Sequence, residues 1–166
     1  MKTLILLRHA KAELAGPSVR DINRVLTAQG EKDALAMAGY LRGLGIGPQV
    51  ILTSPALRAK ITAAIFADCL KLSGESVLCD KSLYCADIAA LYNAVWGLDN
   101  SVSKAVIVGH NPGLSLFLAE LCQNARDDLP SCGLAVIKIN KNEWSMIKNN
   151  SGNLTNLQFP AGLVKL

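Results

Sequence analysis

The sequence has few aromatic residues and little histidine. Only 5% of its 166 residues are aromatic, and there are two histidines. Binding of single-stranded nucleic acid relies on aromatic stacking platforms, and the net charge of +4 is small and dispersed, so no nucleic-acid partner is predicted. No apolar run approaches the roughly 20 residues of a membrane span, so no membrane partner is predicted. Two histidines cannot form a histidine-rich metal site, and we predict neither a metal nor another cofactor.

Cysteine is present but follows no recognisable pattern. The number is odd, the spacing is irregular and there is no C-x-x-C motif, which excludes a regular disulfide framework. We interpret the cysteines as small buried side chains of a protein in a reducing compartment, which predicts a cytoplasmic location. They are Cys69, Cys79, Cys85, Cys122 and Cys132.

The overall composition is that of a folded chain. Hydrophobic residues make up 51% and charged residues 18% of the sequence, which excludes an intrinsically disordered protein. The length corresponds to one domain, so we expect residues 1–166 to form a single domain.

Hydrophobic patterning predicts strands that alternate with helices. The predicted strands are 3–7, 50–53, 77–79 and 105–108, and the predicted helices are 27–42, 54–72, 86–96 and 113–122. This alternation is typical of a three-layer α/β/α fold with a mostly parallel sheet. Residues 134–139 and 143–148 are predicted to form an antiparallel terminal hairpin, and the tail 149–166 is predicted to be loop.

Two helix starts and two buried helix faces are predicted in more detail. Thr27 is a candidate N-cap, and so is Ser54, which precedes a proline. The helical period places Leu35, Ala38 and Leu41 on the buried face of the first helix. The same period in the second helix selects Leu57, Ile61, Ile65, Cys69 and Leu72.

Histidine and arginine occur where predicted strands end. Arg8 and His9 follow the first strand, Arg58 lies in the first turn of the helix after the second strand, and His110 follows the fourth strand. The carboxyl ends of parallel strands line one crevice, so these side chains are expected to meet there. Arginine forks suit a phosphoryl group and histidine suits a nucleophile. From spacing alone, satisfied histidines and a solvated arginine remain open as alternatives.

Arg58 carries a second indication. A cation in the first turn of a helix opposes the helix macrodipole, and a bound anion would offset this cost. The helix start after His110 is likewise a natural anion site.

Four ordered motifs resemble the histidine phosphatase superfamily, which has a phosphoglycerate-mutase-like fold. Residues 6–11 (LLRHAK) are similar to its opening signature, residues 53–62 to its S-P-x-x-R-A-x-x-T motif, and residues 108–112 (VGHNP) to its third motif. The D-x-x-R-x-L-T-x-x-G stretch at 21–30 is similar to that of the short SixA-type branch. The resemblance extends through the motif at 108–112 into the helix that follows.

The resemblance implies a role for each matching residue. His9 would be the nucleophile and form a phosphohistidine intermediate. Arg8 and Arg58 would grip the phosphoryl oxygens, Arg24 would bind substrate as a third fork, and His110 would complete the pocket and stabilise charge. Arginines would supply the positive field without a metal, and this field would keep His9 unprotonated.

One departure from the family bears on the substrate. Many relatives have a glutamate after the third strand that protonates the leaving oxygen, and residues 83–87 contain none. Asp87 or Glu13 could replace it, although each also has a simpler interpretation, as a helix-start charge and a solvated loop charge respectively. Phosphohistidine has a better leaving group than an alkyl phosphate and needs less protonation.

We therefore predict a metal-independent phosphohistidine phosphatase that acts on a phosphorylated protein, such as a histidine-containing phosphotransfer domain. A phosphatase for small phosphomonoesters, with Asp87 or Glu13 as general acid, is the alternative enzyme. A phosphate-binding module without turnover is the alternative from another class.

Overall fold

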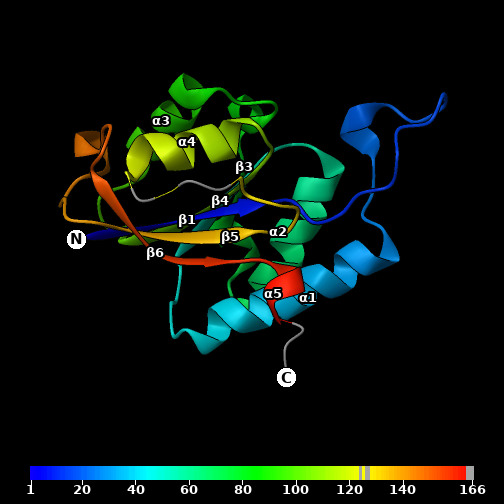
Figure 1. Ribbon diagram of the computed structural model, residues 1–166, viewed down its shortest axis with the longest axis horizontal. Helices are drawn as coiled ribbons and strands as arrows, with labels where there is room; N and C mark the ends of the chain where they lie inside the picture. The colour runs from blue at the N-terminus through cyan, green and yellow to red at the C-terminus, as the bar shows by residue number, and fades with distance from the viewer. Residues whose placement is uncertain (124, 126–127, 164–166) are drawn as a thin grey trace.

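The computed structural model describes residues 1–123, 125 and 128–163, and these form an α/β structure around one six-stranded sheet (Figure 1). The strand order is β3-β2-β4-β1-β5-β6. Strands β3, β2, β4 and β1 are parallel, whereas β5 runs antiparallel to β1 and β6 antiparallel to β5. The strands are β1 Lys2–Arg8, β2 Val50–Thr53, β3 Val77–Cys79, β4 Lys104–Gly109, β5 Leu134–Ile139 and β6 Gly152–Gln158.

Helices cover both faces of the sheet. Figure 1 shows α1 and α2 on one face and α3 and α4 on the other. This confirms the three-layer α/β/α prediction with a mostly parallel sheet. The helices are α1 Ala28–Gly43, α2 Leu57–Leu70, α3 Ile88–Trp96, α4 Gly113–Leu121 and α5 Pro160–Leu163; short 3-10 turns lie at Asp21–Asn23, Gly74–Ser76, Lys81–Leu83 and Trp144–Met146.

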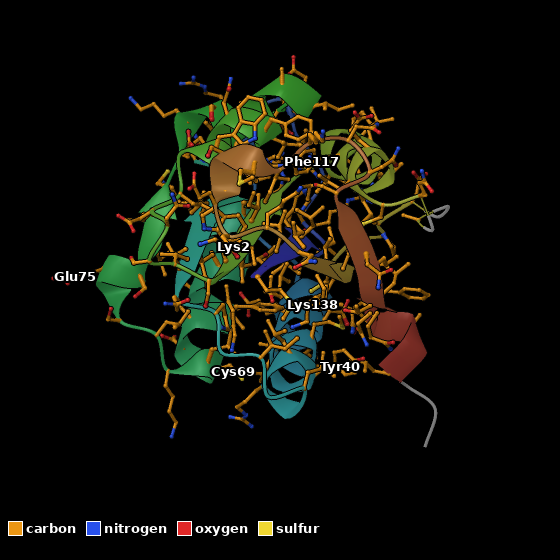
Figure 2. The ribbon with its side chains drawn as sticks, turned by 90° about the vertical axis from the view of Figure 1, so that its left-hand side faces the viewer. Lys2, Tyr40, Cys69, Glu75, Phe117 and Lys138 are labelled. Atoms are coloured by element: carbon orange, nitrogen blue, oxygen red, sulfur yellow. The ribbon has the colours of Figure 1, made fainter. Side chains whose placement is uncertain are left out.

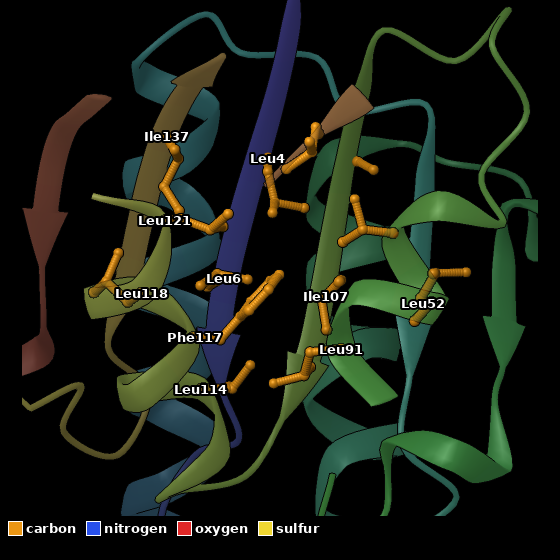
Figure 3. Close-up of a cluster of buried hydrophobic side chains, with 14 of the residues drawn as sticks. Leu4, Leu6, Leu52, Leu91, Ile107, Leu114, Phe117, Leu118, Leu121 and Ile137 are labelled. Atoms are coloured by element: carbon orange, nitrogen blue, oxygen red, sulfur yellow. The ribbon is translucent and has the colours of Figure 1, made fainter. Parts of the chain in front are cut away.

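The central strand β1 is buried on both faces. Leu4 and Leu6 point into the core beneath α3 and α4, where they join Phe117 (Figure 3). Ile5 and Leu7 point into the opposite core beneath α1 and α2. A strand covered by helices on both faces is a continuous apolar run, which explains why residues 3–7 show no alternation of polar and apolar residues.

Lys2, the first residue of β1, is a buried lysine (Figure 2). Its ammonium donates hydrogen bonds to the carbonyls of Asn100 and Val102 at 2.7 and 2.8 Å. It also lies 5.2 Å from the centre of the Trp144 ring. These contacts satisfy a charged side chain that is only 3% exposed.

Across the described residues, the structure has no helix with the length and apolarity needed to cross a bilayer.

The predicted terminal hairpin is wrong in its second strand. Residues 144–146 form a 3-10 turn, and the partner of β5 is β6, which lies in the tail predicted to be loop. Trp144 explains the difference, because it is fully buried and its indole N–H donates to the carbonyl of Val102 at 2.8 Å. The tail prediction also covered residues 164–166, which lie outside the described residues.

The predicted buried helix faces are partly wrong. Leu35 is 61% exposed, and the buried face of α1 is formed by Gly30, Ala34, Met37, Ala38 and Leu41. In α2 the fully buried positions are Arg58, Ala59, Thr62, Ala63, Phe66 and Ala67. Of the residues that the period selected, Leu57 is exposed, whereas Ile61, Ile65, Cys69 and Leu72 are half-buried and pack against the core. Small residues on the inner face allow a helix to lie close to its neighbours, so alanine and glycine occupy several of the most buried positions.

The two predicted N-caps have different outcomes. Thr27 is confirmed, because its Oγ1 accepts a hydrogen bond from the Gly30 amide at 2.9 Å. Ser54 is not a cap: α2 begins at Leu57 with Ala56 as its N-cap residue, and α3 begins at Ile88, later than predicted.

The burial prediction for the cysteines holds for Cys122 and Cys132, while Cys69 is half-buried and Cys79 and Cys85 are exposed.

Candidate active site

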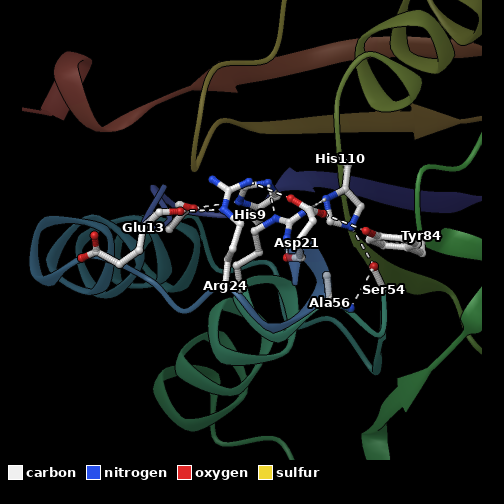
Figure 4. Close-up of polar contacts among 10 residues, drawn as sticks. His9, Glu13, Asp21, Arg24, Ser54, Ala56, Tyr84 and His110 are labelled. Carbon is white, nitrogen blue, oxygen red and sulfur yellow. Dashed lines mark hydrogen bonds and ion pairs between the residues drawn. The ribbon is translucent and has the colours of Figure 1, made fainter. Parts of the chain in front are cut away.

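The carboxyl ends of β1, β2 and β4 bring the predicted residues to one edge of the sheet. Backbone hydrogen bonds continue past the strand ends, from the His9 amide to the Gly109 carbonyl at 3.1 Å and from the Ser54 amide to the Val108 carbonyl at 3.0 Å. The rings of His9 and His110 consequently lie 5.1 Å apart, centre to centre. Figure 4 shows the side chains from these elements converging on one site.

Hydrogen bonds define the tautomer of His9. Its Nδ1 lies 2.7 Å from the Ala10 carbonyl oxygen, which can only accept, so Nδ1 carries the proton. Its Nε2 accepts a hydrogen bond from Arg58 Nε at 3.2 Å. The lone pair of His9 Nε2 is therefore directed into the site and held beside a guanidinium.

His9 is neutral in this environment. Its pKa is lowered from 6.5 to about 4, mainly by burial and further by the charges of Arg58, Arg8 and Arg24; the hydrogen bond to Ala10 acts in the opposite direction. The positive charges thus lower the pKa of His9, as predicted, but burial lowers it more. A neutral imidazole keeps the lone pair that a nucleophile needs.

Arg58 is the most connected side chain of the site. Besides His9, it donates to the carbonyl oxygen of Asp21 at 2.7 Å and to the Asp21 carboxylate at 3.0 Å. One terminal nitrogen lies 3.4 Å from His110 Nδ1. Arg58 is only 5% exposed. The anion expected to offset its position at the helix start is supplied by the chain itself, as the carboxylate of Asp21.

His110 is neutral in the opposite tautomer. Its Nδ1 faces a donor on Arg58, so Nε2 carries the proton and donates to Ser54 Oγ at 2.7 Å. Burial, followed by His9 and Arg58, lowers its pKa from 6.5 to about 4. Because both histidines are neutral at pH 7, the positive charge around them comes from the arginines. Ser54, which the sequence analysis treated as a helix cap, instead orients this histidine.

Asp21 is the functional residue that sequence reasoning missed. Its carboxylate accepts hydrogen bonds from Arg24 at 2.9 Å, Arg58 at 3.0 Å and the Tyr84 hydroxyl at 2.7 Å. These donors, Arg24 first and then Tyr84, hold the pKa of Asp21 well below its usual range. Its place at the head of the D-x-x-R stretch was the available signal. Tyr84 also meets the His110 ring edge-on, with centres 5.7 Å apart.

Arg8 and Arg24 also reach the site, as predicted. Arg8 donates to the Leu129 carbonyl at 3.1 Å, and its Nε is buried without a hydrogen-bond partner among the described residues. Arg24 Nε donates to the Glu13 carbonyl at 2.6 Å. Together with His9, His110 and Arg58, they line a pocket of about 410 Å³. Its remaining lining residues are Lys11, Ala12, Asp21, Cys85, Asn111 and Ser131.

Neither candidate acid lines this pocket. Asp87 caps α3, where its carboxylate accepts from the Ala90 amide at 2.8 Å. Glu13 contributes its backbone carbonyl to Arg24. The carboxylate that does line the pocket belongs to Asp21, and its lowered pKa keeps it ionised at neutral pH. No group of three or more histidine, cysteine or acidic residues arranged to hold a metal occurs within the described part of the chain.

The lowered pKa values of the two histidines can be measured directly, because the chain has only these two. We predict that NMR titration gives both rings a midpoint near pH 4 instead of 6.5. The folded state then binds fewer protons than the unfolded state between these values, so the free energy of unfolding falls as the pH drops from about 6.5 to 4. Midpoints near 6.5 for both rings would contradict this description of the site.

Comparison with known proteins agrees with this geometry. Residues 4–82 match the histidine phosphatase superfamily (branch 1). Phosphohistidine phosphatase SixA of Escherichia coli (strain K12) is 30% identical over 120 residues, which cover 72% of this chain and 73% of that protein. A structure of a SixA described as a putative phosphohistidine phosphatase, from Nakamurella multipartitia, has a TM-score of 0.83 at 26% identity and covers 96% of both chains.

A structure of the protein histidine phosphatase SixA in complex with tungstate has a TM-score of 0.81, also at 26% identity, over 97% of this chain and 99% of that one. The order of the motifs, the sheet topology and the sequence identity all indicate the same family. The chain therefore belongs to the histidine phosphatase superfamily, branch 1.

Proposed function

We propose that this protein is a metal-independent phosphohistidine phosphatase that acts on a phosphorylated protein through a covalent phospho-His9 intermediate. The observation that supports this most strongly is the neutral His9, whose Nε2 lone pair points into a pocket lined by Arg8, Arg24 and Arg58. The similarity to the Escherichia coli protein named phosphohistidine phosphatase supports the substrate class. The SixA complex with tungstate, a tetrahedral oxyanion like phosphate, supports an oxyanion as the group that is bound.

In the first step, His9 Nε2 attacks the phosphorus atom of the substrate. The bond from phosphorus to the substrate imidazole breaks, and its electron pair stays on that imidazole, which leaves as a neutral ring when its other nitrogen is protonated. Arg58 Nε moves its hydrogen bond from His9 Nε2 to a phosphoryl oxygen, since the lone pair that it contacted now bonds phosphorus. The arginines thus stabilise the charge that spreads over the phosphoryl oxygens.

In the second step, water attacks the phosphorus of phospho-His9. The bond between phosphorus and Nε2 breaks, a proton of the water passes to the released phosphate, and His9 returns to its neutral form. The hydrogen bond from His9 Nδ1 to Ala10 holds the ring in one tautomer through both steps. His110 and Ser54 fix the opposite wall of the pocket by their mutual hydrogen bond.

The position of the carboxylates favours phosphohistidine over an alkyl phosphate. An alkoxide leaving group needs a proton donor, and the carboxylate lining the pocket is the ionised Asp21. Asp87 and Glu13, the candidate acids for small phosphomonoesters, do not line the pocket that contains His9, and the Asp87 carboxylate caps α3. An unprotonated nucleophile favours turnover over a phosphate-binding module. A phosphoprotein substrate, such as a histidine-containing phosphotransfer domain, a single domain over residues 1–166 and a cytoplasmic location remain part of this proposal.

The covalent step can be trapped. Mixing the enzyme with a protein labelled on phosphohistidine and quenching in alkaline detergent should leave labelled phosphate on His9. The adduct should be stable in base and labile in acid, as expected for a phosphorus–nitrogen bond. His9→Ala should carry no label. Equal labelling of wild type and His9→Ala would disprove the assignment of His9 as the nucleophile.

Asp21 should affect activity by positioning two arginines. We expect Asp21→Asn to lower kcat/KM for phosphohistidine by roughly tenfold, because hydrogen bonds to charged groups are worth about 1.5–3 kcal/mol and this side chain is partly exposed to solvent. Asp68→Asn is a matched control, since Asp68 is exposed near the end of α2, whereas Arg58 lies in the first turn of that helix. Identical kinetics for the two variants would show that Asp21 has no such role.

The substrate class is tested by comparing substrates in the presence of EDTA. We expect a phosphohistidine-bearing protein to be hydrolysed at full rate after exhaustive chelation, since arginines supply the positive charge. Sugar phosphates should be hydrolysed far more slowly, because they lack a good leaving group. Rapid hydrolysis of sugar phosphates that is lost in Asp87→Asn would favour the phosphomonoester alternative. Activity that disappears with EDTA and returns with Mg²⁺ would contradict metal independence.

A further inference from the structure

A second pocket of about 460 Å³ opens directly beside the catalytic pocket. The two pockets share three lining residues, Cys85, His110 and Asn111, so they are adjacent. Their chemistry differs. The catalytic pocket is lined by arginines and histidines, whereas the second pocket is lined mainly by apolar side chains and backbone. Its other lining residues are Ala86, Asp87, Ile88, Ala89, Pro112, Gly113 and Leu116.

Two helix starts form the walls of this apolar pocket. Ile88 and Ala89 lie in the first turn of α3, and Pro112 and Leu116 lie one turn apart at the start of α4. Leu116 is 54% exposed, although its neighbours Leu114 and Phe117 are buried in the core. A lone exposed leucine needs no explanation, but this one borders a concave apolar surface next to a reactive histidine.

Two lining residues of the pocket, Ala86 and Gly113, are in close backbone contact. A Cβ atom on Gly113 would collide with the carbonyl oxygen of Ala86. Glycine at position 113 therefore allows the segment before α3 and the start of α4 to meet backbone to backbone. This contact fixes the separation of the walls, so the pocket exists before a substrate arrives.

We propose that the apolar pocket receives an apolar side chain of the phosphoprotein that lies beside its phosphohistidine. This inference rests on the proposed function, because it requires a phosphorylated imidazole at His9. The position of the pocket supports it: the His9 and His110 rings are 5.1 Å apart, and His110 lines both pockets. A side chain that enters the apolar pocket therefore lies close to a phosphoryl group at His9.

The lining explains why the neighbouring side chain is apolar. Asp87 is the charged residue of the lining, and its carboxylate already accepts the hydrogen bond that caps α3. An apolar side chain would bury the most surface here, because most of the lining is apolar side chain and backbone.

The test uses helix-forming peptides with one phosphohistidine and with leucine or serine four residues before and after it. Wild type should hydrolyse the leucine peptide with a kcat/KM roughly tenfold or more above that of the serine peptide, the scale expected from burying a leucine side chain. Leu116→Ser, and Ala89→Gln on the opposite wall, should remove most of this preference. Leu35→Ser is the matched control, because Leu35 is 61% exposed on α1.

Phosphoramidate, which has no neighbouring side chain, separates this inference from the proposed function. Hydrolysis of phosphoramidate should be unchanged in Leu116→Ser and Ala89→Gln. Equal hydrolysis of both peptides by wild type, or a leucine preference that survives in both pocket variants, would overturn the inference while leaving the proposed function intact. If neither phosphohistidine peptide is hydrolysed but another phosphate ester is, the proposed function fails, and this inference fails with it.

Discussion

The guanidinium of Arg58 connects the parts of the site, and the arrangement of the site depends on it. It donates to the lone pair of His9, to the backbone and carboxylate of Asp21, and lies beside His110. These partners belong to the segment after β1, the loop before α1 and the segment after β4, while Arg58 itself comes from α2. A nearly buried cation needs such partners, since an unpaired charge at 5% exposure would be costly. The contacts that stabilise Arg58 are therefore the same contacts that assemble the site.

The electrostatics of the site combine several arginines with two neutral histidines. Burial lowers the pKa of both rings, and the nearby guanidinium groups act in the same direction. Asp21 carries the opposite charge and holds Arg24 and Arg58 in place. The result is a positive pocket in which His9, the proposed nucleophile, is nonetheless uncharged. Such fixed charges require little reorganisation during a reaction, which is how a site without a metal can stabilise a phosphoryl group.

Much of the fold and site could be predicted because the signals were local. Residues 3–7 and 50–53 are short apolar runs, and each is followed directly by the polar residues that a strand end presents. The predictions were wrong where contacts between residues far apart in the sequence determine the local structure. Trp144 lies in a 3-10 turn with its ring buried and its indole N–H bonded to the Val102 carbonyl, and no local pattern indicates this. Leu35 has the correct spacing for burial but lies on the exposed face of α1, because alanine and methionine fill the interface.

The same distinction applies within the site. Arg8, His9, Arg58 and His110 could be placed from strand ends, whereas Asp21 is connected to Arg58 across 37 positions of sequence and to Tyr84 across 63. Ser54 precedes a proline as a helix cap would, yet its hydroxyl is occupied by His110. A polar side chain near a helix start has several possible partners, and only the folded chain shows which one it contacts.

The central claim is that Arg58 Nε donates a hydrogen bond to the lone pair of His9 Nε2 until that lone pair bonds to phosphorus. A crystal structure with orthovanadate, which mimics phosphorus during transfer, tests this most directly. The account predicts vanadium bonded to His9 Nε2, with Arg58 Nε now donating to a vanadate oxygen and the hydrogen bond from His9 Nδ1 to Ala10 retained. Vanadate bound in the pocket without a bond to His9, with Arg58 Nε still donating to Nε2, would contradict it.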